Sequence, residues 1–131
     1  MNQVQGLYYA FGQLAYAVAA ADGKIDATER NMLHDQLVKL ANSHGVEFDY
    51  SEIIFRLLEH DHIDVKTAYE WAMKEMKLNE YYLTEKRKED FISILTKIAE
   101  ANPPVTINEQ MLIDRFTEDI SKLKGDPIFT S

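Results

Sequence analysis

The feature that most constrains this chain is a short polar corner at residues 18–29, VAAADGKIDATE, between two apolar helical patterns. Asp22-Gly23 is a turn signal, because glycine adopts backbone angles that other residues resist. Asp26 can cap a following helix, and Glu29, three residues later, can complete a capping box. The corner therefore predicts the end of one helix, a tight turn and the start of a second helix, with three carboxylates near its positive end.

A similar corner, ANPPVTINE, occupies residues 101–109, eighty residues after the first. Aligned with the first corner, it places Asn102 at the turn, Thr106 at the cap and Glu109 at the last position. We interpret the pair as a divergent internal duplication. Ordinary helix capping produces similar corners without duplication, and that alternative stays open.

Helical periodicity runs through most of the chain. Apolar residues recur at helical spacing in five long segments: 3–21, 27–42, 65–79, 85–101 and 107–124. A short further helix is expected to begin at residues 49–51 and to end near Glu59, and no segment alternates long enough to indicate a strand. The predicted fold class is all-α. We expect one compact domain of six to seven helices at 1–125, in two related helix-loop-helix halves, and a tail at 126–131.

Composition narrows the function classes. The chain has 131 residues, no cysteine and a net charge of −8. Disulfides, thiol catalysis and cysteine-ligated zinc are therefore excluded, and a nucleic-acid partner is disfavoured because phosphates would be repelled. The basic run Lys86-Arg87-Lys88 precedes two acids and indicates a solvated helix face. No secretory signal and no apolar stretch near the ~20 residues of a membrane span occur, so we expect a soluble cytoplasmic protein.

Histidine and tryptophan residues offer few further sites. His34 and His44 are predicted to lie at the surface, since neither has a second ligand at helical spacing. His60 and His62, beside two acids, could bind zinc or nickel, but we favour the alternative, a polar loop between helices. Trp71 falls off the apolar stripe of its helix, and we expect it to pack in the core or at its edge.

The first corner can also carry chemistry. Hard cations prefer oxygen ligands, and Asp22, Asp26 and Glu29 supply three carboxylates from one turn. The pattern matches the second half of an EF-hand loop, but Val18 and Ala20 occupy the first two ligand positions, so an ordinary EF-hand is rejected. The second corner could add oxygens from four residues: Glu100, Asn102, Asn108 and Glu109. Oxygen ligands favour calcium or magnesium over zinc. The alternative is that these carboxylates only cap helices.

The stretch 14–37, LAYAVAAADGKIDATERNMLHDQL, resembles the signature of the TerB-like family of bacterial tellurite-resistance proteins. The match lies in the run from Ala21 to Ile25 and in Glu29. The resemblance implies an all-helical domain with two related halves, a divalent-metal site at Asp22, Asp26, Glu29 and Glu109, and a role in stress-response or sensing assemblies. Related domains also accompany J domains in co-chaperones. The second corner departs from the acidic pattern, because Asn and Pro replace Asp-Gly there.

Two functions follow as expectations. The first is a non-enzymatic, cation-binding regulatory module that works with a protein partner. The second is a helical interaction or scaffold domain that binds no metal and uses the corner only for capping. An enzyme is disfavoured, because the sequence shows no glycine-rich phosphate loop, no cysteine and no local serine-histidine-acid arrangement.

Overall fold

The computed structural model describes residues 2–21, 27–45, 64–100 and 105–124, apart from the side chains of 27–29. These ranges contain five α-helices and one 3-10 helix: α1 (Gln3–Ala19), α2 (Ala27–Ser43), α4 (Val65–Leu78), η1 (Glu80–Tyr82), α5 (Glu85–Glu100) and α6 (Ile107–Ser121). No strand occurs within them, which confirms the all-α prediction. The predicted short helix near residues 49–59, the core position of Ile25 and the tail 126–131 fall outside them, so a total of six to seven helices stays a prediction.

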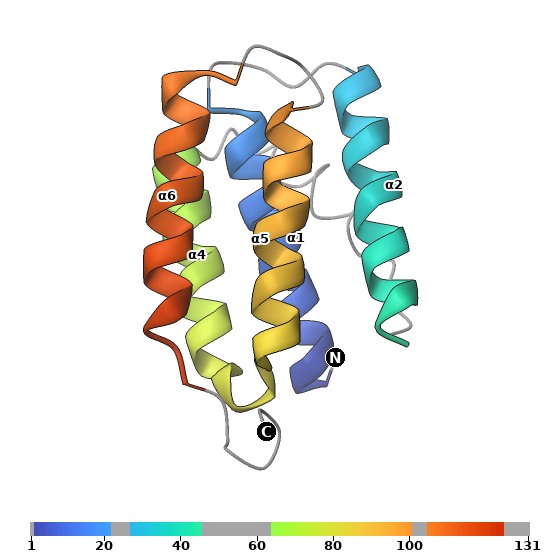
Figure 1. Ribbon diagram of the computed structural model, residues 1–131, viewed down its shortest axis with the longest axis vertical. Helices are drawn as coiled ribbons and strands as arrows, with labels where there is room; N and C mark the ends of the chain where they lie inside the picture. The colour runs from blue at the N-terminus through green and yellow to red at the C-terminus, as the bar shows by residue number, and fades with distance from the viewer. Residues whose placement is uncertain (1, 22–26, 46–63, 101–104, 125–131) are drawn as a thin grey trace.

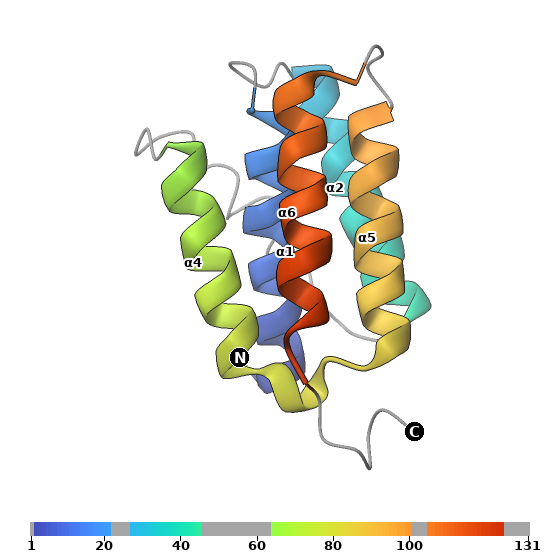
Figure 2. The ribbon, with the colours of Figure 1, turned by 60° about the vertical axis from the view of Figure 1, so that its left-hand side comes forward.

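The described helices lie side by side in a bundle (Figure 1). Helices α1 and α5 run in one direction, and α2, α4 and α6 run in the other (Figures 1 and 2). Helix α1 contacts every other described helix, whereas α2 lies at one side of the bundle against α1 and α5. Among the described helices, none combines the length and the apolar character that crossing a bilayer requires.

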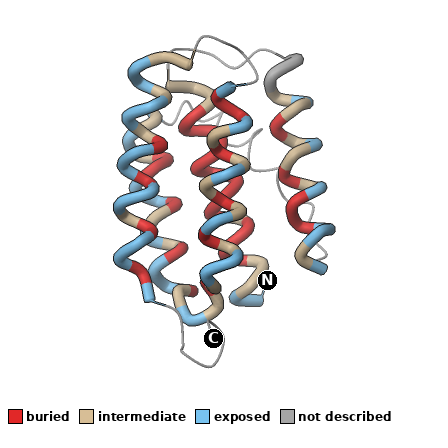
Figure 3. Tube along the Cα trace, viewed as in Figure 1, coloured by how far each residue is buried: buried red, intermediate tan, exposed pale blue. Residues whose placement is uncertain are grey.

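Helix α1 is the centre of the core. From Gly6 to Val18 every residue except Tyr9 is buried, including the polar Gln13 (Figure 3). The periodicity predicted one apolar stripe on this helix, but the structure buries it on all sides. The reason is visible in its sequence, where glutamine is the only polar side chain besides tyrosine hydroxyls. A helix that is apolar all round is stable only when neighbours cover it on every side.

Helix α4 packs closely along α1 because both helices carry small residues. Its buried face includes Ala68 and Ala72, and on α1 the glycine Gly6 lies against Asn79 at the end of α4. A Cβ at Gly6 would lie 2.8 Å from Asn79 Nδ2. That nitrogen is already committed, since it donates to the carbonyl oxygen of Glu75 at 2.8 Å.

Helix ends follow the predicted capping. The Asp64 carboxylate accepts a hydrogen bond from the Thr67 amide at 2.7 Å, and Thr84 Oγ1 accepts from Arg87 N at 3.1 Å. Hydrogen bonds from the backbone amides lower the pKa of Asp64 below its ordinary value. Gly45 follows α2 with φ of 70°, a left-handed conformation that favours glycine. These caps confirm the predicted starts of α4 and α5 and the predicted end of α2.

Two predictions about individual side chains are wrong. Lys88 does not belong to a solvated face: only 8% of it is exposed, and its ammonium donates to the carbonyl oxygen of Leu123 at 2.6 Å, which ties the end of α6 to α5. Trp71 is not a core residue, because 49% of it is exposed on α4. Lys88 lies three residues before Phe91 and seven before Leu95, on the buried face of α5, so its position was misjudged from its charge. Trp71 lies off the apolar stripe of α4, and its exposure agrees with that position.

Candidate functional site

The predicted cation site lies mostly outside the described residues. Asp22 and Asp26 belong to the segment that is not described, and the side chain of Glu29 is not described either. The flanking helices lie close to the predicted bounds, however. Helix α1 ends at Ala19, two residues before the predicted end, and α2 begins at Ala27, as predicted.

Glu109, the fourth predicted ligand, has a defined role in the structure. Its Oε1 accepts hydrogen bonds from the Thr106 amide at 3.1 Å and from Thr106 Oγ1 at 3.0 Å. In return, Thr106 Oγ1 accepts from the Glu109 amide at 3.2 Å, which completes a capping box at the start of α6. The capping alternative is thus realised at this corner, and metal binding by Glu109 stays a prediction.

The helix ends that flank the two corners lie at the same end of the bundle. Helices α1 and α5 end there, and α2 and α6 begin there (Figures 1 and 2). Of the other candidate oxygens, Glu100 is the last residue of α5 and Asn108 is the second residue of α6. Asn102 falls outside the described residues, as do His60 and His62. Within the described part of the chain, no group of three acidic, histidine or cysteine side chains could hold a metal ion.

A second cluster joins three helices that the sequence did not connect. Tyr8 Oη of α1 is hydrogen-bonded to His44 Nδ1 at the end of α2, and His44 Nε2 lies 2.5 Å from Asp90 Oδ2 of α5. Arg87 Nε donates to Tyr8 Oη at 3.4 Å, and Lys86 Nζ lies 3.2 Å from Asp90 Oδ1. His44 was predicted to lie at the surface, but only 10% of its side chain is exposed. That prediction is wrong.

The cluster favours one arrangement of protons. A neutral His44 that carries its proton on Nε2 donates to Asp90 and accepts the Tyr8 proton at Nδ1, so every partner is satisfied. Burial would raise the pKa of Asp90, but hydrogen bonds from His44 and Lys86, together with the Lys86 charge, hold it below its ordinary value. Burial raises the pKa of the Tyr8 hydroxyl, and the Arg87 guanidinium offsets part of that rise.

A hydroxyl, an imidazole and a carboxylate in series can relay a proton, and nucleophilic enzymes use this arrangement. Here the hydroxyl belongs to a tyrosine that is only 2% exposed, and its ring packs edge-on against Phe91 with centroids 5.5 Å apart. No substrate can reach an atom buried in this way. The cluster therefore fastens the end of α2 to α1 and α5 and is not a catalytic site.

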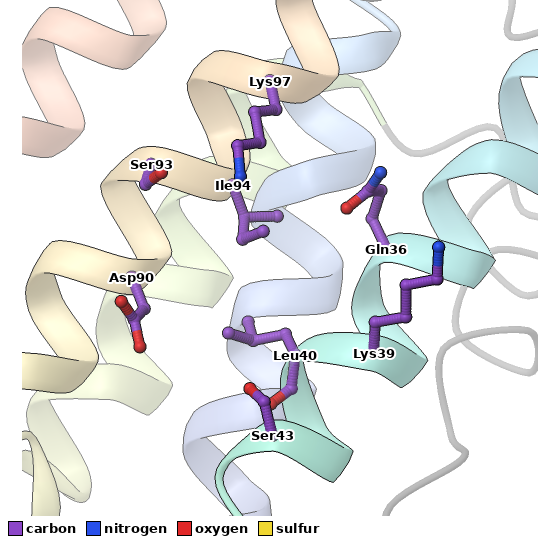
Figure 4. A pocket seen from close by; sticks show the side chains of 8 residues that line it. All are labelled: Gln36, Lys39, Leu40, Ser43, Asp90, Ser93, Ile94 and Lys97. Atoms are coloured by element: carbon purple, nitrogen blue, oxygen red, sulfur yellow. The ribbon is translucent and has the colours of Figure 1, made fainter.

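Asp90 also reaches a cleft between α2 and α5, with a volume of about 310 Å³ (Figure 4). Four residues from each helix line it: Gln36, Lys39, Leu40 and Ser43 from α2, and Asp90, Ser93, Ile94 and Lys97 from α5. Its single carboxylate is already paired with His44 and Lys86. The cleft offers ammonium, hydroxyl and amide groups but no nucleophile beside an unpaired base, so it lacks the constellation that acid-base catalysis needs.

Sequence reasoning missed the cluster because its members are far apart in the chain. Tyr8 and His44 are separated by 36 residues, and His44 and Asp90 by 46. One local signal was available: His44 immediately precedes the glycine that ends α2, and the last turn of a helix is a common place for histidine.

Comparison with known proteins does not assign the chain to a family, since no family model, curated protein or solved structure matches it.

Proposed function

We propose that this chain is a non-enzymatic, TerB-like regulatory module that binds a divalent cation at its acidic corner and works in a stress-response or sensing assembly. The observation that supports the proposal is the position of the described helix ends on either side of each corner. The helix ends that flank both corners lie at one end of the bundle, so oxygens of either corner can serve a common site (Figure 1). Asp22, Asp26 and Glu29 are the proposed ligands, with Glu109 as the contribution of the second corner.

The helix bounds support the duplication on which a shared site depends. Helix α2 begins at residue 27 and α6 at residue 107, a separation of 80. Helix α1 ends at residue 19 and α5 at residue 100, a separation of 81. The two helix pairs also run in matching directions, out along one helix and back along the next (Figures 1 and 2). This agreement is what two related helix-loop-helix halves require.

The test is a thermal melt of chelator-treated protein with calcium, magnesium, manganese and zinc added in turn. A cation that binds only the folded state, at 100-fold excess over Kd, raises the free energy of unfolding by about 2.7 kcal/mol. For a domain of this size, Tm should then rise by roughly 10 °C. The variant Asp22→Asn/Asp26→Asn should lose the shift. The control variant Asp35→Asn/Glu118→Gln removes the same charge from exposed positions on α2 and α6, and it should keep the cation-induced rise in Tm.

Two outcomes would overturn the cation proposal. One is a shift of equal size in both double variants, which would assign the effect to general charge screening. The other is the absence of a shift with any of the four cations, which would leave the acidic corner as a capping device.

A second function, a helical interaction domain without metal, is supported by one exposed apolar row. Trp71 and Leu78 lie seven residues apart on α4, and therefore on one side of it, and Tyr81 follows in η1. Their exposed fractions are 49%, 66% and 63%. Exposed aromatic and aliphatic residues in one row are typical of partner surfaces. A photo-crosslinking amino acid in place of Trp71 should give protein adducts in cells, whereas one in place of Asp114 on α6 should not.

A further inference from the structure

A hollow between α4 and α6 has the features of a small-molecule site. Its volume is about 440 Å³, within the roughly 300–1,000 Å³ typical of ligand pockets. The two helices diverge toward the end of the bundle where α6 begins (Figure 2). The hollow is lined by residues from the first turns of both helices. Val65, Tyr69, Met111 and Leu112 supply apolar surface, and Lys66 and Arg115 supply positive charge.

The wall on α6 is one helical face. Asn108, Met111, Leu112 and Arg115 follow the spacing i, i+3, i+4 and i+7, which places them in one row about 10 Å long. Helix α6 faces the core with a different set, Ile113, Phe116 and Ile120. Of the row, only Leu112 also packs against the core. Met111 is 63% exposed although it belongs to this apolar wall.

Arg115 lines the hollow, and although its side chain is 53% exposed, two neighbouring residues position it. Its guanidinium carbon lies 4.4 Å from the centre of the Tyr69 ring, and its Nε lies 3.6 Å from Asp119 Oδ2. Tyr69 Oη donates to the same Asp119 oxygen at 2.6 Å, and Tyr69 is 1% exposed. Burial and this carboxylate raise the pKa of Tyr69, so the hydroxyl keeps its proton and the arrangement is fixed at neutral pH. An arginine positioned in advance loses less freedom when it binds an anion.

Charge defines which ligands the hollow selects. Its described lining holds two cationic side chains and no carboxylate, in a chain whose net charge is −8. The nearby Asp64 is used at the start of α4, where it accepts the Thr67 amide. An apolar hollow with a cationic rim is complementary to a molecule that has an apolar body and one negative end.

We infer that the hollow between α4 and α6 binds a small organic acid, with its apolar body against Val65, Met111 and Leu112 and its carboxylate at Lys66 and Arg115. This site goes beyond the proposed cation site. The hollow borders both corners, since Ala21 and Asn108 also line it, but none of its described lining residues is one of the four proposed cation ligands. The described lining holds no nucleophile beside a base, so we infer binding without reaction.

The probe for this inference is decanoate, titrated into the full chain by calorimetry. Saturable binding of one molecule is expected, with decanol and decyltrimethylammonium about tenfold weaker or undetectable, because they lack the negative end. Lys66→Gln should weaken decanoate about tenfold, whereas Lys77→Gln, at the other end of α4, should leave its affinity unchanged. Met111→Ser should weaken both decanoate and decanol, and Leu78→Ser, equally exposed at 66%, should weaken neither.

Methyl NMR of the five methionines locates the ligand. The Met111 methyl signal, assigned from its loss in Met111→Ser, should move during the titration, while that of the fully buried Met76 should not. Decanol binding as tightly as decanoate would overturn the inference, as would equal affinities of the Lys66 and Lys77 variants, or a Met111 signal that does not move. None of these results depends on whether a cation binds at the acidic corner.

Discussion

Helices α4 and α2 both pack on α1, but they are attached by different means. Helix α4 is attached by close apolar packing, in which Ala68, Ala72 and Met76 are fully buried. Helix α2 also buries apolar side chains, among them Leu33 and Leu37, and adds a polar fastening at its end, where His44 joins Tyr8 and Asp90. Figure 1 shows α2 standing at the side of the bundle.

The difference between the two attachments separates two kinds of stability. Apolar packing has no titratable group and responds to lost volume. A hydrogen-bonded imidazole and carboxylate respond to the loss of one partner and to pH. We therefore expect α4 to open only with the whole domain, and α2 to open locally when its fastening is cut.

The largest effect is expected at the α4 attachment. Met76→Ala removes a fully buried side chain and should lower the free energy of unfolding by about 2–5 kcal/mol. Met111→Ala is the matched control, because that methionine is 63% exposed, and it should change stability by about 0.5 kcal/mol or less. Urea denaturation measures both. Equal effects would show that the α1–α4 contact is not a close-packed core.

Cutting the α2 fastening should have a smaller and more local effect. Tyr8→Phe removes the hydroxyl that is hydrogen-bonded to His44 Nδ1, and it should lower the free energy of unfolding by about 1–3 kcal/mol. Hydrogen exchange should become faster in α2 while α4 stays protected. Tyr81→Phe removes a hydroxyl from a 63% exposed tyrosine and serves as the control. Faster exchange spread evenly over all helices would contradict a separate attachment of α2.

Acid should act on the same fastening. The folded-state pKa of Asp90 is below its ordinary value, so its contribution is complete above the unfolded pKa of about 3.9 and is lost as pH falls through the folded pKa. Asp90→Asn should cost about 1–2 kcal/mol at pH 7 and should flatten the stability profile below about pH 4. Unfolding free energies measured between pH 7 and pH 2 provide the comparison. If the variant loses the same unfolding free energy between pH 4 and pH 2 as the unchanged protein, Asp90 is not the cause of that loss.

The smallest effect is expected at the end of α2. Gly45 has φ of 70°, and nothing lies within 4 Å of the position a Cβ would take, so only backbone strain opposes a side chain there. Gly45→Ala should therefore lower the free energy of unfolding by about 1 kcal/mol. Gly45→Asn should cost less, because asparagine tolerates the left-handed region. If alanine and asparagine behave alike in thermal melts, the cost does not come from φ.

Helix positions and caps were predictable because they depend on neighbours in the chain. Thr106 with Glu109, Asp64 at α4 and Gly45 after α2 all act within three or four residues of their partners. The burial of α1 on all sides was also predictable from its composition, since glutamine is its only polar side chain besides the tyrosine hydroxyls.

Tertiary partners were not predictable in this way. The bonds that bury His44 and Lys88 join residues 35 to 46 positions apart, and no local period encodes them. The hollow between α4 and α6 likewise depends on how two distant helices diverge. For the acidic corner, the bounds of α1 and α2 agree with the prediction, whereas the ligand set stays a prediction.

The complete burial of α1 has a consequence for biosynthesis. This helix emerges from the ribosome before α4, α5 and α6, which cover it in the finished molecule. During translation its apolar surface therefore lacks its native neighbours until the α6 segment has emerged, and native contacts form late between segments distant in sequence. Nascent chains stalled before residue 105 should for this reason be captured by chaperones that bind apolar segments, and release should follow completion of α6.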